Sequence, residues 1–112
     1  MYHYNAKVLR IVDGDTYDMK VDLGFDIWVK TRFRLNGVDT PETWRPTTEA
    51  ERAHGHEATA AVKEFMEGQM VEITSYSKDK YGRYLCDVEK DGISLAGMLL
   101  AKGLAKRESY ED

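Results

Sequence analysis

Residues 16–35, TYDMKVDLGFDIWVKTRFRL, contain two stretches in which apolar and polar side chains alternate. The first runs from Thr16 to Leu23 and is followed by Gly24. Alternation with a period of two is typical of a strand that buries one face. The second stretch has an apolar face, Ile27, Val29, Thr31, Phe33 and Leu35, and a basic face, Trp28, Lys30, Arg32 and Arg34. We therefore expect paired strands over 16–23 and 27–35, with the apolar face of the second strand in the core.

A helix is predicted after this pair. Thr48 and Glu51 fit a capping box, and apolar residues then recur every three or four positions. Gly68 is placed to end the helix. Because Gly55 interrupts the helical pattern, we expect the regular helix to begin only near His56.

The remaining elements lie before the pair and after the first helix. An apolar run at 8–12 ends at Asp13-Gly14, a dipeptide that favours hairpin turns. Strands are predicted over 70–76 and 83–89, and a second helix over 94–102. Three strands, a helix, two strands and a helix follow one another as in an OB-fold, a five-stranded barrel that commonly binds oligonucleotides. The expected class is mainly β (α+β), although other α+β folds share this order.

The composition is that of an ordinary globular protein. Of 112 residues, 42% are hydrophobic and 32% charged, and the net charge is −4. We expect one domain over residues 1–112, with Cys86 as a buried thiol and no internal disulfide. No apolar run is long enough for a membrane span and no secretory signal is present, so the expected location is intracellular. The acidic balance opposes binding of nucleic acid by bulk charge, so phosphate recognition is expected to be local.

Charged side chains concentrate in three segments, 13–16, 34–42 and 79–83. Each segment alone has a structural explanation, because Asp-Gly favours turns and Asp-Thr-Pro-Glu favours a turn or the start of a helix. Together they allow chemistry. The carboxylates of Asp15 and Asp39 are hard oxygen ligands that suit Ca²⁺ or Mg²⁺ and leave positions for water and a phosphate oxygen.

Three further residues complete a set suited to phosphodiester hydrolysis. Glu42 can take a proton from an attacking water, and Arg34 and Arg83 can hold phosphate oxygens as negative charge develops on them. A noncatalytic module that binds nucleic acid or protein remains the alternative. Such a module has no need for Glu42 or for two carboxylates, so the complete set favours an enzyme.

Four segments, in the same order, resemble the staphylococcal nuclease (thermonuclease) family. They are IVDGDT at 11–16, FRL to VDTPET at 33–43, DKYGR at 79–83 and GLAK at 103–106. The resemblance implies an OB-fold with packed helices and a Ca²⁺-dependent nuclease, with Mg²⁺ as the less favoured metal. It also implies cleavage of DNA and RNA to 5′-hydroxyl and 3′-phosphate ends. A phage or mobile-element origin fits a short relative of this kind, although no residue selects it.

The resemblance assigns a role to each matching residue. The calcium ligands would be Asp15, Asp39 and the carbonyl of Thr40; Arg34, Glu42 and Arg83 would act on the scissile phosphate; Lys80 and Tyr81 would contact the substrate; and Asp13 would support the metal ligands. The C-terminal end departs from the family pattern. In place of a tyrosine pair it has residues 107–112, RESYED, where Tyr110 alone could stack on a base, and the family's third helix has no counterpart. We therefore expect a weak hold on substrate and a monomer or a homodimer.

Two pairs of residues can each be interpreted as substrate contacts or as structural residues. Lys30 and Arg32 share a strand face with Arg34 and either extend a phosphate track or form a solvated face. Trp28 and Trp44 are large enough to stack on bases. We interpret Trp28 as packing at one end of the barrel and Trp44 as a contact in the loop of the site.

Overall fold

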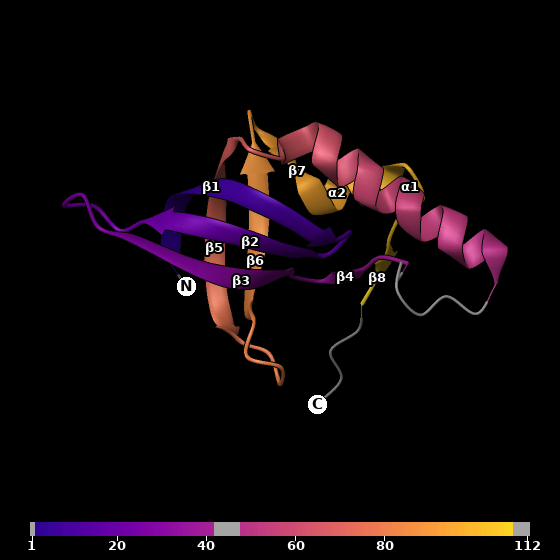
Figure 1. The fold of residues 1–112 in the computed structure, drawn as a ribbon, viewed down its shortest axis with the longest axis horizontal. Helices are drawn as coiled ribbons and strands as arrows, with labels where there is room; N and C mark the ends of the chain where they lie inside the picture. Colours follow the sequence, from indigo (N-terminus) through magenta and orange to yellow (C-terminus); the bar gives the residue numbers. More distant parts are fainter. Residues whose placement is uncertain (1, 42–47, 109–112) are drawn as a thin grey trace.

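The computed structural model describes residues 2–41 and 48–108 (Figure 1). The strands are β1 (Tyr2–Asp13), β2 (Thr16–Asp22), β3 (Trp28–Leu35), β4 (Val38–Asp39), β5 (Met70–Lys78), β6 (Tyr84–Lys90), β7 (Ile93–Ser94) and β8 (Lys106–Arg107). The helices are α1 (Glu49–Met66) and α2 (Leu95–Ala101). Within this described part, no helix has the length and apolar character of a membrane span.

Five strands close into a barrel. β1, β2 and β3 form an antiparallel meander, β1 also pairs with β5, and β5 pairs with β6. A parallel pairing of residues 33–35 in β3 with residues 84–86 in β6 closes the ring. Figure 1 shows the meander crossing in front of β5 and β6, with both helices at one end of the barrel. The mainly β, OB-type barrel with two packed helices is confirmed.

The core fills the barrel and continues beneath the helices. Its largest fully buried side chains are Tyr17, Met19, Leu35, Met66, Leu95 and Leu99. Cys86 is also fully buried, and this burial raises the pKa of its thiol well above the ordinary value. The prediction of a buried cysteine is therefore confirmed, and the thiol is packed as a small apolar group.

Helix α1 begins earlier than predicted. The Thr48 side chain caps it by accepting a hydrogen bond of 3.0 Å from the Glu51 backbone N–H, as expected. Gly55 does not delay the helix; it lies on the buried stripe that continues through Ala58 and Val62. Glycine costs about 1 kcal/mol inside a helix, and the cap and this packed stripe outweigh that cost.

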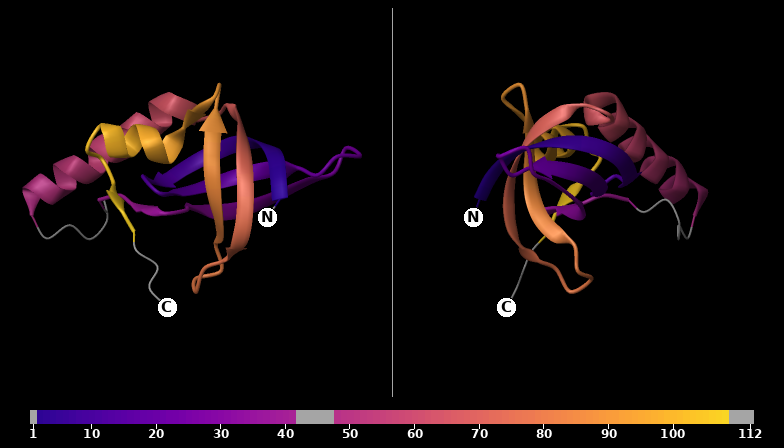
Figure 2. Two further views of the ribbon diagram at one scale, coloured as in Figure 1. Left: turned by 180° about the vertical axis from the view of Figure 1, so that it is seen from behind. Right: turned by 60° about the vertical axis from the view of Figure 1, so that its left-hand side comes forward.

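The face pattern predicted for β3 is correct only at one end. Phe33 and Leu35 are buried, but Ile27 and Val29 are 53% and 44% exposed. Arg34, predicted on the outer face, is buried. The reason is that the β2–β3 hairpin extends beyond the barrel, where no layer of the described residues covers either face, as seen in Figure 1 and from two other sides in Figure 2. The other end of β3 pairs with β6, and Arg34 there contacts β4 and Glu108, the residue after β8.

Candidate functional site

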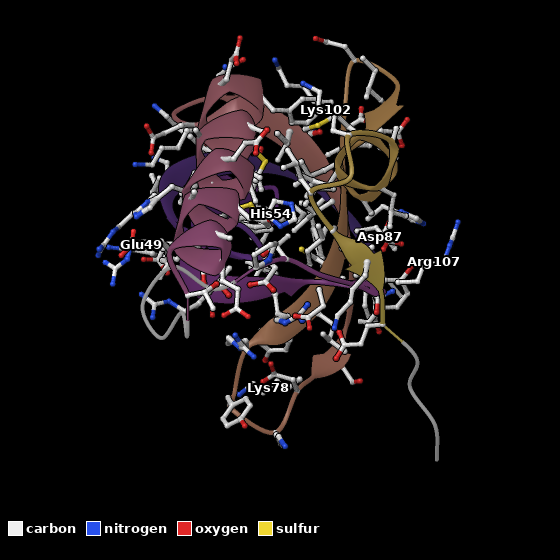
Figure 3. All side chains as sticks on the ribbon, turned by 90° about the vertical axis from the view of Figure 1, so that its right-hand side faces the viewer. Glu49, His54, Lys78, Asp87, Lys102 and Arg107 are labelled. Carbon is white, nitrogen blue, oxygen red and sulfur yellow. The ribbon has the colours of Figure 1, made fainter. Side chains whose placement is uncertain are left out.

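An open cleft of about 730 Å³ lies where the β1–β2 turn, the β5–β6 loop and the end of β8 meet. The predicted site residues that line it are Asp13, Asp15, Arg34, Asp39, Lys80, Tyr81 and Arg83. Figure 3 views the molecule from this end, with Arg107 of β8 on one side and Lys78, at the end of β5, below. The fold thus brings three distant segments of sequence to one cleft.

Arg34 is fixed by its own strand and by the turn that follows. Its Nη1 donates hydrogen bonds to the carbonyl oxygens of Leu35, at 2.6 Å, and Val38, at 2.9 Å. The side chain is only 10% exposed. These contacts hold one edge of the guanidinium against the backbone, so the Nη2 edge is directed toward the acidic residues of the cleft.

Three carboxylates surround that edge of Arg34. Nη2 lies 3.1 Å from Oδ1 of Asp39, 3.1 Å from Oε2 of Glu108 and 3.4 Å from Oδ2 of Asp15. Burial raises the pKa of Asp39; the Arg34 guanidinium opposes this rise, and the carboxylates of Asp15 and Glu108 add to it. A guanidinium offers several donors in one plane, and a phosphate group could take the positions that these oxygens now occupy.

Asp15 is held by the turn and by the segment after β4. Its Oδ1 accepts a hydrogen bond of 3.2 Å from the Thr16 hydroxyl, and its Oδ2 accepts one of 3.3 Å from the Thr40 N–H. Gly14 allows this approach, because a Cβ at that position would lie 2.6 Å from the Thr40 hydroxyl oxygen. That oxygen is buried and has no hydrogen-bond partner among residues 2–41 and 48–108.

These residues fit a hard cation by their chemistry. Asp15 and Asp39 present carboxylate oxygens to the same arginine nitrogen, and Thr40 adjoins both. Oxygen donors of this kind suit Ca²⁺ and Mg²⁺. Over residues 2–41 and 48–108, no three His, Cys, Asp or Glu side chains form a group that could hold a metal ion.

Arg83 enters the cleft from the other side, held by Asp79. Its Nε and Nη2 both lie 2.7 Å from Oδ2 of Asp79, and Oδ1 accepts hydrogen bonds from the N–H groups of Tyr81 and Arg83 at 2.8 and 3.0 Å. Burial alone would raise the pKa of Asp79, but these hydrogen bonds and the guanidinium together lower it. Arg83 Nη1 donates to the Thr16 hydroxyl at 3.2 Å. Asp79 therefore orients the Arg83 side chain toward the β1–β2 turn.

Lys80 and Tyr81 lie at the rim of the cleft. The Tyr81 side chain is 72% exposed. Lys80 Nζ lies 5.2 Å and Arg83 Cζ 5.3 Å from the centroid of its ring. An exposed ring with two cations against it is accessible to a ligand in the cleft.

Asp13 is turned toward the helix. Its Oδ1 accepts a hydrogen bond of 2.9 Å from the Gly14 N–H and one of 3.5 Å from the Thr59 hydroxyl of α1. It therefore ties the β1–β2 turn to α1. Three predicted residues, Glu42, Trp44 and Tyr110, lie outside the described residues.

Two residues of the site were not assigned from sequence, Asp79 and Glu108. The spacing of Asp79 and Arg83 was a usable signal, because an acid four residues from an arginine across a glycine turn can hold it. Glu108 gave no such signal. It reaches Arg34 because β8 pairs Arg107 with Val38 and because its own N–H donates to the Gly37 carbonyl at 3.0 Å.

A second hollow, of about 870 Å³, lies between β1, β5, β6 and the end of β2. The charged side chains of its lining are acidic and include Asp22, Glu72, Asp87 and Glu89. Repulsion from these carboxylates disfavours phosphate there. The cleft with Arg34 and Arg83 is therefore the candidate site for an anionic substrate.

Comparison with known proteins identifies relatives that match most of the chain. The family model for "Staphylococcal nuclease homologue" matches residues 32–112. Thermonuclease of Staphylococcus intermedius is 41% identical over 106 residues, covering 92% of this chain and 59% of the relative. Thermonuclease of Staphylococcus hyicus is 35% identical over 106 residues, covering 93% and 59%. An uncharacterized endonuclease of Escherichia coli O157:H7 is 28% identical over 102 residues, covering 90% and 59%. The chain thus spans about three-fifths of the length of these relatives.

Proposed function

The chain belongs to the staphylococcal nuclease homologue family, and from that premise we propose that it is a metal-dependent nuclease that hydrolyses phosphodiester bonds of DNA and RNA. One observation carries the proposal. Arg34, in β3, and Arg83, in the loop before β6, are linked through Asp15 and Thr16 by successive contacts of 3.4, 3.2 and 3.2 Å. Two arginines held this close by one turn can bind the same phosphate group.

The two arginines provide the charge that the reaction requires. As water adds to the phosphorus atom, negative charge builds on the phosphate oxygens, and fixed guanidinium donors stabilise it. Because Arg34 and Arg83 are already held by backbone carbonyls and by Asp79, little reorganisation is needed. Arg83 would also assist the departing oxygen.

Glu42 is the proposed base that takes a proton from the attacking water. It follows Asp39 by a few residues, and the resemblance to the family assigns it this role. Hydrolysis would leave 5′-hydroxyl and 3′-phosphate ends. Lys80, Tyr81 and Tyr110 would contact the substrate, and Asp13 would keep the turn in place through α1.

Asp15, Asp39 and the carbonyl of Thr40 would hold Ca²⁺, or less favourably Mg²⁺. The bound cation would neutralise charge on a phosphate oxygen. In the structure, the Arg34 guanidinium balances the negative charge of Asp15 and Asp39. The same two carboxylates could balance the charge of a metal cation beside them. We further propose that residues 1–112 act as one domain.

The test is cleavage of end-labelled single-stranded DNA with Ca²⁺, with Mg²⁺ and with a chelator. A Glu42→Gln variant should lose about 10² to 10⁴ in rate, the usual contribution of a general base. Glu64→Gln, an exposed change of the same kind on α1, is the matched control and should cut normally. Calcium-dependent release of 3′-phosphate ends would support the proposal. Binding of the strand without cleavage under any of these conditions would instead support the noncatalytic module.

A further inference from the structure

The outer face of the β1–β2–β3 meander has a row of three lysines. Lys7 lies directly opposite Lys20, and Lys20 lies directly opposite Lys30, on three adjacent strands. Like charges that face one another across a sheet destabilise it. Repulsion within this row therefore lowers the stability of the folded state, and a bound anionic ligand would offset that repulsion.

The lysine row is continuous with the candidate site. Along β3 the side chains of Lys30, Arg32 and Arg34 share one face, because the register with β2 has no irregularity. Arg32 lines the cleft and is held by Asp18, with Nε 2.8 Å from Oδ1. Successive cations on this face are about 6.6 to 6.8 Å apart along the strand. The cleft and the lysine row therefore form one track.

An aromatic ring lies at the far end of the track. Trp28 is 43% exposed, and Lys20 Nζ lies 4.8 Å from its ring centroid. Our interpretation of Trp28 as packing at the end of the barrel is therefore wrong. The ring is on the outer face, on the extended part of the hairpin, where a base can stack on it.

The charge on this face is opposite to the charge of the whole chain. Its outward side chains include the cations Lys7, Arg10, Lys20, Lys30 and Arg32, against the acids Asp18 and Asp22. The chain as a whole has a net charge of −4. Positive charge gathered on one face of an acidic protein directs a polyanion to that face.

We propose that this face is a binding track for single-stranded nucleic acid, which leads the strand from Trp28 past Lys30 and Arg32 to the cleft. The proposal rests on the proposed nuclease function and names the form of its substrate. A single strand is favoured over a duplex because a base must be unpaired to stack on Trp28. The phosphates would follow the cations, and the protein would read no sequence.

The first experiment measures binding of a fluorescent 20-nucleotide oligothymidylate in chelator, so that the strand is not cut, over a series of salt concentrations. The Lys7→Gln/Lys30→Gln variant should bind roughly tenfold more weakly at low salt. Its slope of log K against log salt should fall by about 1.4, since each phosphate contact on a single strand contributes about 0.7. Its melting temperature should stay level or rise, because like charges have been removed.

Lys63→Gln/Lys102→Gln is the matched control, since both lysines are exposed, lie on or directly after the helices and lose the same charge. It should keep the native slope. Trp28→Ala should weaken binding of oligothymidylate roughly tenfold and leave an abasic strand of equal length unaffected. Equal slopes in the two double variants would overturn the track. So would equal binding of a duplex with no effect of Trp28→Ala.

Cleavage of a trinucleotide and of the 20-nucleotide strand separates this inference from the proposed function. The Lys7→Gln/Lys30→Gln variant should raise KM for the longer substrate only, because the trinucleotide fills the cleft without reaching the lysine row. If the native protein cuts neither substrate but the slopes still differ, the nuclease proposal fails and the track stands. If the Lys7→Gln/Lys30→Gln variant cuts both substrates with the KM values of the native protein, the track fails and the nuclease proposal stands.

Discussion

The two ends of the β2–β3 ladder use positive charge in opposite ways. Arg34, at the barrel end, is buried, is bonded to two backbone carbonyls and is surrounded by three carboxylates. Lys30, on the same face of the same strand, is exposed and lies opposite another lysine. A buried charge must be fully paired, whereas an exposed lysine remains hydrated without a partner. The barrel end therefore holds its arginine in one fixed position. The lysines of the hairpin end suit a nucleic-acid strand that can slide along them.

The largest expected difference between the two ends is that between Arg34→Ala and Lys30→Ala. Arg34→Ala should reduce cleavage by about 10² to 10³, because the donor that we propose for the scissile phosphate is lost. It should also reduce the free energy of unfolding by about 3 to 5 kcal/mol, because buried carboxylates lose their partner. Lys30→Ala should change stability by less than about 0.5 kcal/mol. Urea unfolding and initial rates measure both effects, and similar losses in the two variants would contradict the comparison.

A second comparison concerns two acids that each hold an arginine of the cleft, Asp79 with Arg83 and Asp18 with Arg32. Asp79→Asn should cost about 1 to 3 kcal/mol, because Asp79 anchors a loop through several charge-assisted hydrogen bonds. Asp18→Asn should cost less than about 1 kcal/mol, because its partner Arg32 is half exposed. Unfolding of each variant in urea at pH 7 measures the difference.

The pH dependence of the same variants sharpens this result. Because the folded-state pKa of Asp79 is lowered, its contribution is complete above the unfolded pKa of about 3.9 and is lost as the pH falls through the folded value. The native protein should therefore lose stability below about pH 4, and Asp79→Asn should lose less over that range. A constant gap between the two proteins down to acid pH would show that the carboxylate charge is not responsible.

Two glycines test how tightly each end of β2 is packed. Gly14→Ala should cost about 1 to 3 kcal/mol and lower the cleavage rate, because the new methyl group displaces Thr40 from Asp15. Gly24→Ala, at a backbone φ of +81° in open space, should cost about 1 kcal/mol through backbone strain and leave cleavage unchanged. Thermal melting and the cleavage assay distinguish the two. A normal rate in Gly14→Ala would show that Thr40 need not hold its position.

The smallest effect is expected at the tip of the hairpin. Phe25 has a φ of +55° and is 97% exposed, followed by Asp26 at +60°. Asparagine tolerates this left-handed backbone better than phenylalanine, so Phe25→Asn should stabilise the protein by about 0.5 kcal/mol. A rise of one or a few degrees in melting temperature would show it. A fall would mean that the Phe25 ring has a packing partner.

The sequence predicts most of the barrel because its signals are local. Alternation places the strands, the Thr48 and Ser94 caps place the helices, and the three charged segments predict the residues of the cleft. The cap at Ser94 accepts a hydrogen bond from the Gly97 N–H at 3.1 Å. Such contacts within a few residues depend little on the rest of the fold. The charged segments met in one cleft because each follows or begins a strand of the barrel.

The features that the sequence does not predict depend on which distant segments pack over a residue in the folded protein. Alternation on β3 gives the two faces but does not show that Ile27 extends beyond the barrel while Arg34 is enclosed by it. Gly55 lowers helix propensity, and its place on a packed stripe is visible only in three dimensions. Glu108 reaches Arg34 through the pairing of β8 with β4, two short strands without a periodic pattern.

The parallel contact of β3 with β6 also determines when the cleft is assembled during synthesis of the chain. It joins Phe33 to Tyr84, and the β4–β8 pair joins Val38 to Arg107, so both closures link distant parts of the chain. Contacts of such high order form late, because the entropy of closing long loops must be met first. Arg34 and Arg83 therefore meet only after β6 has been made, and Glu108 joins them after β8.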